Sequence, residues 1–200
     1  MTLIFPGARR FPFAPCQGLA LVLIAGASVQ GHSSEPLYVK NLSPVSGLFG
    51  LPSQRSAFTT GSGSFAAAVH SSVANHYVED SNDVESLNID GETLRFALEA
   101  RLGIAENWDI QVEIPWLDHS GGNLDSIIDS WHDLWGMSDG GRPDVDQDLL
   151  DYRYQAPGAS FAFEDDASGL GDITVSLNHE FFRTPTSAAG LALGYKFASA

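Results

Sequence analysis

The sequence has one cysteine, few basic residues and no long apolar run, and each shortage excludes a class of protein. Cys16 is the only cysteine in 200 residues, which excludes a disulfide framework and a cysteine-based zinc site. Ten lysines and arginines against 25 acidic residues give a formal charge of −15, opposite in sign to what nucleic-acid binding requires. No apolar run reaches the ~20 residues of a transmembrane helix. With 44% hydrophobic residues, however, the chain has enough apolar surface to fold.

The N-terminus has the three parts of a secretory signal peptide. Arg9 and Arg10 precede an apolar stretch over residues 18–26, which ends in the small residues typical of a cleavage site. A membrane anchor would need an apolar run about twice as long. We therefore predict export, with a signal peptide over residues 1–27 and a periplasmic segment over residues 28–63.

Hydrophobic residues in the rest of the chain recur with a period of two. In residues 93–103, for example, Leu94, Phe96, Leu98 and Leu102 alternate with polar or small residues. This alternation is typical of a two-faced β-strand. It predicts an all-β, antiparallel chain of about five strands, over residues 64–78, 93–103, 108–116, 172–181 and 191–197.

The connections between these strands favour an up-and-down transmembrane β-barrel over a soluble sandwich. Two predicted turns, at residues 103–107 and 183–187, are short, whereas the links at residues 79–92 and 118–172 are long. The two long links hold 19 of the 25 acidic residues. Outer-membrane barrels have short periplasmic turns and long, charged outer loops, because an apolar band cannot carry that charge.

Two tryptophans add a weaker argument for a membrane. Trp108 and Trp116 lie on the apolar face of one predicted strand, eight residues apart. At 3.3 Å per residue they are about 26 Å apart, close to the height of a lipid-facing band between two aromatic girdles. The alternative is that both pack in the core of a secreted, soluble β-sandwich that serves as a binding module.

The barrel hypothesis places the polar face of the strands in a lumen. Arg95, Glu99 and Arg101 on one strand and Glu113 on the next are then lumen-lining residues that form ion pairs. Closed bacterial barrels have an even number of strands, eight or more. We therefore expect residues 64–200 to be the N-terminal part of an incomplete barrel, which suggests a truncated chain.

The long outer loop over residues 118–171 contains a predicted amphipathic helix at residues 123–135. Asn123 is the expected N-cap and Gly136 the expected stop. We expect the helix to pack against or into the barrel mouth. The helix residues of interest, apolar apart from the histidine, are Leu124, Ile127, Ile128, Trp131, His132, Leu134 and Trp135.

Two patterns could carry chemistry, and neither is specific. Asp129, His132 and Asp133 have a helical spacing that could share a metal, but a solvated acidic face is the commoner meaning, so we predict no metal and no cofactor. His70 and Ser72 share one face of a strand, as the base and nucleophile of an outer-membrane lipid hydrolase would. On the barrel hypothesis these two side chains point away from lipid, so we predict that the chain is not an enzyme.

Several short motifs are spread over residues 36–197. They are Asn41-Leu42-Ser43-Pro44, Gly50-Leu51-Pro52, residues 90–95, Ile114-Pro115-Trp116, Gly121-Gly122, Trp131-His132-Asp133, Gly140-Gly141-Arg142 and Gly169-Leu170-Gly171-Asp172. Together they resemble a family of proteobacterial outer-membrane barrels that has no assigned function. The Gly-x-Gly-Asp motif at residues 169–172 is also shared with barrels similar to transporters of aromatic-degradation (meta-pathway) systems.

The resemblance implies location and architecture, and it supplies no catalytic residue. We expect a passive small-solute conduit or a surface scaffold in the outer membrane. Its expected partners are outer-membrane lipid, lipopolysaccharide and the barrel-assembly machinery. The identity of the solute stays open.

Overall fold

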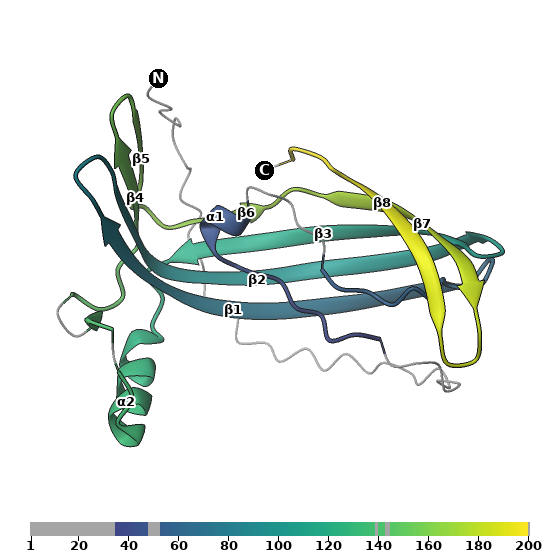
Figure 1. Cartoon of the computed structure of the whole chain (residues 1–200), viewed down its shortest axis with the longest axis horizontal. Helices are drawn as coiled ribbons and strands as arrows, with labels where there is room; N and C mark the ends of the chain where they lie inside the picture. Colours follow the sequence, from purple (N-terminus) through teal and green to yellow (C-terminus); the bar gives the residue numbers. More distant parts are fainter. Residues whose placement is uncertain (1–34, 48–52, 139, 143–144, 200) are drawn as a thin grey trace, which may run out of the picture.

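The chain forms one antiparallel β-sheet with two short helices (Figure 1). The computed structural model describes residues 35–47, 53–138, 140–142 and 145–199, so the predicted signal peptide lies outside the described residues. The predicted all-β class is confirmed. No helix in these ranges has both the length and the apolar character needed to span a membrane.

Five strands form an up-and-down meander, and three shorter strands are added at its side. Neighbouring strands pair in the order β1-β2-β3-β7-β8, β4 continues beside β2 with β5 next to it, and β6 pairs with β3. β1 and β8 do not pair with each other, so the sheet of the described residues is not closed into a barrel. The strands are β1 (Phe65–Ser81), β2 (Ser86–Ala105), β3 (Trp108–Ser120), β4 (Asp151–Ala156), β5 (Ala159–Phe163), β6 (Ala167–Leu170), β7 (Thr174–Arg183) and β8 (Ala188–Lys196), and the helices are α1 (Pro44–Gly47) and α2 (Asp125–Trp135).

The expectation of a long loop over residues 79–92 is wrong. β1 stays paired with β2 as far as Ser81 and Ser86, and only residues 82–85 connect them. The side chain of Asn82 accepts hydrogen bonds from the backbone N–H groups of Val84 and Glu85, at 2.8 and 3.0 Å. The end of this hairpin carries mostly polar residues on both strands, which hides the alternation that marks a strand.

The link over residues 118–172 contains the predicted helix and also strands that the sequence did not reveal. β4 pairs with residues 86–90 of β2, and the β4–β5 hairpin builds a small apolar core there. The members of this core are Ile89, Leu150 and Tyr152, with Leu87 and Phe163 packed against them. Burial raises the pKa of the Tyr152 phenol above its ordinary value.

The burial of the meander is inverted relative to that of a soluble protein. Along β2, Arg95 and Glu99 are 4% and 8% exposed, whereas Phe96 and Leu98 are 45% and 47% exposed. We call the side of the sheet that carries Arg95 and Glu99 the charged face, and the side that carries Phe96 and Leu98 the apolar face. Soluble proteins almost never bury charged residues while large apolar neighbours stay exposed.

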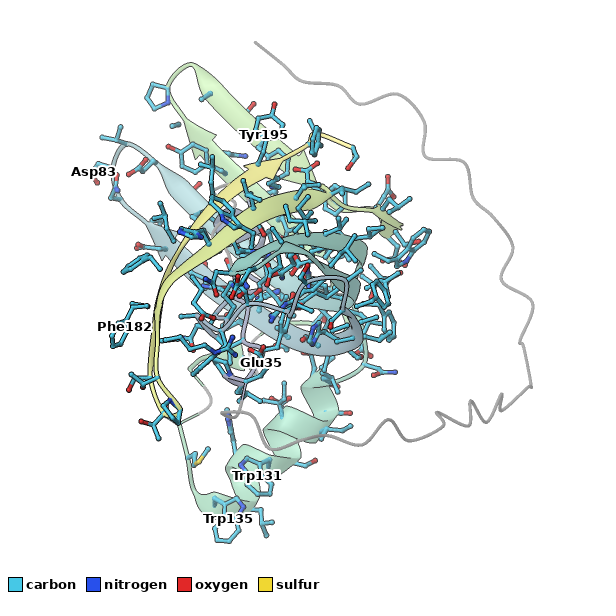
Figure 2. The ribbon with its side chains drawn as sticks, turned by 90° about the vertical axis from the view of Figure 1, so that its right-hand side faces the viewer. Glu35, Asp83, Trp131, Trp135, Phe182 and Tyr195 are labelled. Atoms are coloured by element: carbon cyan, nitrogen blue, oxygen red, sulfur yellow. The ribbon has the colours of Figure 1, made fainter. Side chains whose placement is uncertain are left out.

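Helix α2 does not pack on the sheet, contrary to our expectation. It extends away from the strands beyond β1, and Figure 2 shows Trp131 and Trp135 at a distance from them. Its apolar side is exposed, since Ile127, Trp131, Leu134 and Trp135 all have more than half of their surface accessible. The predicted stop is confirmed, because Gly136 ends the helix in the left-handed conformation with φ of 61°.

Candidate functional site

The charged face is covered by the chain's own N-terminal segment. We call residues 35–47 and 53–60 the strap. Figure 2 shows Glu35 among the strands, and the strap contacts side chains or backbone of all five strands of the meander. The approach is close at Gly103, where a Cβ atom would lie 2.6 Å from the carbonyl oxygen of Thr60 and 2.0 Å from that of Gly61, the residue that follows the strap, so only glycine fits.

Glu113 is the centre of the first cluster under the strap. Its Oε1 accepts hydrogen bonds from Arg95 of β2 at 2.6 Å and from the Lys40 ammonium of the strap at 3.1 Å. Its Oε2 accepts one from the Tyr38 hydroxyl at 3.0 Å. The Tyr38 ring stacks on His70 of β1, with ring centroids 3.7 Å apart. Two strap residues thus complete the shell of one buried carboxylate.

Asp109 is the centre of the second cluster and is fully buried. Its Oδ1 accepts a hydrogen bond from the side-chain amide of Asn178 at 2.6 Å and lies 3.5 Å from the Arg55 guanidinium of the strap. The other oxygen accepts the backbone N–H of Thr60 at 2.9 Å. Arg55 also donates to Gln111 at 2.9 Å. The strap therefore places a cation and a backbone donor on this second carboxylate.

Two further contacts hold the strap. Glu180 of β7 accepts a hydrogen bond from the backbone N–H of Thr59 at 2.9 Å. Arg101 of β2 bridges Glu99, at 2.9 Å, and Glu35 of the strap, at 2.7 Å. Every carboxylate named on this face has a hydrogen-bonding partner, as buried charges require.

The four residues predicted to line a lumen do share one face of the sheet. Arg95 pairs with Glu113, and Arg101 with Glu99, as the predicted ion pairs require. That they line a lumen stays a prediction. Asp109 and Glu180 were missed, although both alternate with apolar residues in the sequence. The strap residues were missed because nothing local in the sequence indicates contacts with strands more than 50 residues away.

Comparison with known proteins gives one result. A family model described as "Protein of unknown function (DUF3187)" matches residues 17–199. The chain belongs to this family. No curated protein and no solved structure matches it. The predicted membership of an uncharacterised family is confirmed, while the outer-membrane location of that family stays a prediction.

In this member of the DUF3187 family, a second buried network lies at the end of the sheet that carries α2. Arg142 forms ion pairs with Asp90 of β2 and Asp125 of α2, and its guanidinium lies 5.0 Å from the centre of the Tyr77 ring. Burial lowers the pKa of Arg142, but its hydrogen bonds to the two carboxylates outweigh that effect, and the pKa lies above its ordinary value. Asp125 also accepts from Asn75 of β1 at 2.7 Å. Arg142 thus joins the β1–β2 hairpin to the start of α2.

The N-terminus of α2 is capped by a strand residue rather than by Asn123 as predicted. Glu92 Oε1 accepts the backbone N–H groups of Asn123 at 3.2 Å and Leu124 at 2.5 Å, and Leu124 occupies the N-cap position without a side-chain cap. Gly122 has φ of +74°, and a Cβ atom there would lie 2.0 Å from the Glu92 side chain. The Gly-Gly motif before the helix therefore leaves room for this carboxylate.

The remaining candidates of the DUF3187 chain do not converge on a site. Asp129 accepts a hydrogen bond from Gln147 at 2.8 Å. In the described ranges, no three metal-ligating side chains are placed so that they could hold an ion, and this holds for Asp129, His132 and Asp133 as well. His70 stacks on Tyr38 and approaches Glu99 at 3.5 Å, and neither partner is the serine nucleophile that a hydrolase places beside its histidine.

The two tryptophans lie on the apolar face, one at each end of the apolar run over residues 108–116 of β3. Trp108 is 36% exposed and Trp116 is 46% exposed. Trp108 also stacks on His179 of β7, with ring centroids 4.1 Å apart. Neither ring is buried in a core, as the soluble-sandwich alternative would require.

Proposed function

We propose that this chain forms the wall of an outer-membrane β-barrel that acts as a passive conduit for small solutes. The inverted burial of the meander carries the proposal. Apolar residues such as Val69, Leu98 and Leu193 are exposed on one face, while Arg95 and Asp109 are buried on the other. Water is a poor solvent for the first face, and hydrocarbon suits it.

The apolar face fits a lipid-facing surface in position as well as in composition. It extends over β1, β2, β3, β7 and β8, and β3 carries a tryptophan at each end of its apolar run over residues 108–116. Aromatic residues at both boundaries of an apolar band are typical of outer-membrane barrels. Outer-membrane lipid, with lipopolysaccharide near the outer ends, is the partner that this surface fits, and barrels of this class need an assembly machinery.

The charged face fits the interior of a conduit. Paired Arg and Glu side chains on adjacent strands give a polar wall that stays compatible with water when the strap moves. A surface scaffold would need no charged wall, so the conduit is the better match. The proposal involves no catalysis.

Membrane extraction tests the proposal. The full chain, expressed with its own N-terminus in a Gram-negative host, should stay in the outer-membrane fraction after washes with high salt and with sodium carbonate. Detergent should release it, because hydrocarbon contact rather than charge holds it in place. Recovery in the soluble periplasmic fraction would contradict the proposal and favour the secreted β-sandwich.

A further inference from the structure

We propose that Glu113 and Asp109 are two binding subsites for organic cations, and that Lys40 and Arg55 of the strap are tethered occupants of these subsites. The inference rests on the proposed conduit and names the class of solute that it takes. An ammonium group occupies one carboxylate and a guanidinium group the other. A free solute with the same groups would find the same partners once the strap withdraws.

The wall without the strap has an excess of negative charge. Among the side chains of the charged face that are at most 12% exposed, the strands contribute two arginines, Arg95 and Arg101. They also contribute four carboxylates, Glu99, Asp109, Glu113 and Glu180. The strap adds Lys40 and Arg55, which bind two of these carboxylates. A wall with excess carboxylates attracts cations and repels anions, as rings of acidic side chains do in cation channels.

The strap is built so that it can leave without opening the sheet. Its contacts with the wall at the two subsites run through side chains, apart from the backbone N–H of Thr60, and no strand includes residues 35–47. Leu37 and Val39 are 80% and 55% exposed, so apolar burial contributes little to holding this part. Each lost contact is replaced by water, and the net cost of such an exchange is small.

The second subsite contains a buried acceptor atom that lacks a hydrogen-bond donor. Asn178 is 3% exposed, and its Oδ1 atom has no hydrogen-bond partner among the described residues. A cavity of about 160 Å³ lies beside it, and Arg55, Thr59 and His179 are among its lining residues. Arg55 occupies this region with an imperfect fit, since its guanidinium lies 3.5 Å from Asp109. A small guanidinium compound could add a donor that the Asn178 oxygen lacks.

The test measures binding of guanidinium and of acetate to the full chain in lipid vesicles, because binding does not require a closed pore. Lys40→Gln and Arg55→Gln each remove one tethered cation and should raise guanidinium affinity about fivefold, with little change for acetate. Methylammonium should compete with guanidinium for this binding. Arg153→Gln is the matched control, because it removes the same charge from β4 and should leave the affinity at the level of the unsubstituted chain.

Two further measurements separate the possible failures. Adding Glu113→Gln to Lys40→Gln should abolish the gain, because the subsite itself is then lost. Equal gains for guanidinium and acetate, or no gain in either strap variant while the protein floats with the vesicles, would overturn the cation subsites alone. Failure of the unsubstituted chain to float with lipid would overturn the conduit, and the subsites with it.

Discussion

The most deeply buried large side chains in the described part of the chain are polar or charged. Glu180, Thr93, Asp109 and Asp125 all have less than 2% exposure or lie at that limit. Burying a carboxylate costs several kcal/mol unless donors replace the lost water. In this fold the donors come from residues far away in sequence, so each buried acid ties two distant segments together.

Replacing Arg142 with methionine should strongly destabilise the end of the sheet that carries α2. The substitution removes the only cation that forms an ion pair with Asp90 and Asp125 among the described residues, and both acids are almost fully buried. Removing one partner of a buried ion pair costs about 3–5 kcal/mol. We expect faster proteolytic cleavage within residues 121–150 and a lower unfolding temperature.

Arg153→Met is the control for this prediction. Arg153 is half-exposed and pairs with Asp151, which also accepts a hydrogen bond from Asn88 at 2.8 Å. The Arg153 hydrogen bond lowers the pKa of Asp151, but an exposed ion pair of this kind is screened by water and contributes little to stability. Equal protease sensitivity of the two variants would show that Arg142 does not join the hairpin to α2.

At the scale of whole elements, the sequence predicted those strands whose side chains alternate between two chemically different faces. The five meander strands were predicted because one face is apolar over their middle length and the other carries charged, polar or small residues. The hairpin end at residues 79–92 and the β4–β5 hairpin were not predicted, because their residues do not alternate in this way. The first is mostly polar on both strands, and the second packs on a small local core. Helix α2 was found from its own amphipathic pattern, whereas its cap was not, since Glu92 lies 32 residues before Leu124.

The dependence of α2 on Glu92 can be tested by hydrogen exchange. Glu92→Ala removes the acceptor of the Asn123 and Leu124 N–H groups, which should cost about 1–2 kcal/mol. The amides of α2 should then exchange roughly 5–30 times faster. Glu92→Gln keeps an acceptor oxygen, so its effect should be smaller. Glu106→Ala, in the turn between β2 and β3 at the opposite end of the sheet, should leave α2 unchanged.

At the scale of the whole molecule, the meander separates a charged surface from an apolar one. The charged face is satisfied within the chain by its own pairs and by the strap, while the apolar face has no comparable cover in the described residues. The strap contacts could not be foreseen, because the ion pair of Lys40 with Glu113 joins residues 73 positions apart and depends on the curvature of the finished sheet.

A single arginine on the apolar face distinguishes lipid from water as the solvent of that face. Leu98 lies in the middle of the apolar run of β2 and is 47% exposed. If lipid covers this face, Leu98→Arg should lower the free energy of unfolding from vesicles by about 2–4 kcal/mol, because the charge would enter the hydrocarbon. If water covers it, an exposed leucine is replaced at a cost below about 0.5 kcal/mol. Val84→Arg, at the exposed tip of the β1–β2 hairpin, is the matched control and should be neutral in both cases. Equal urea midpoints for the Leu98→Arg and Val84→Arg variants would therefore exclude a lipid-facing wall.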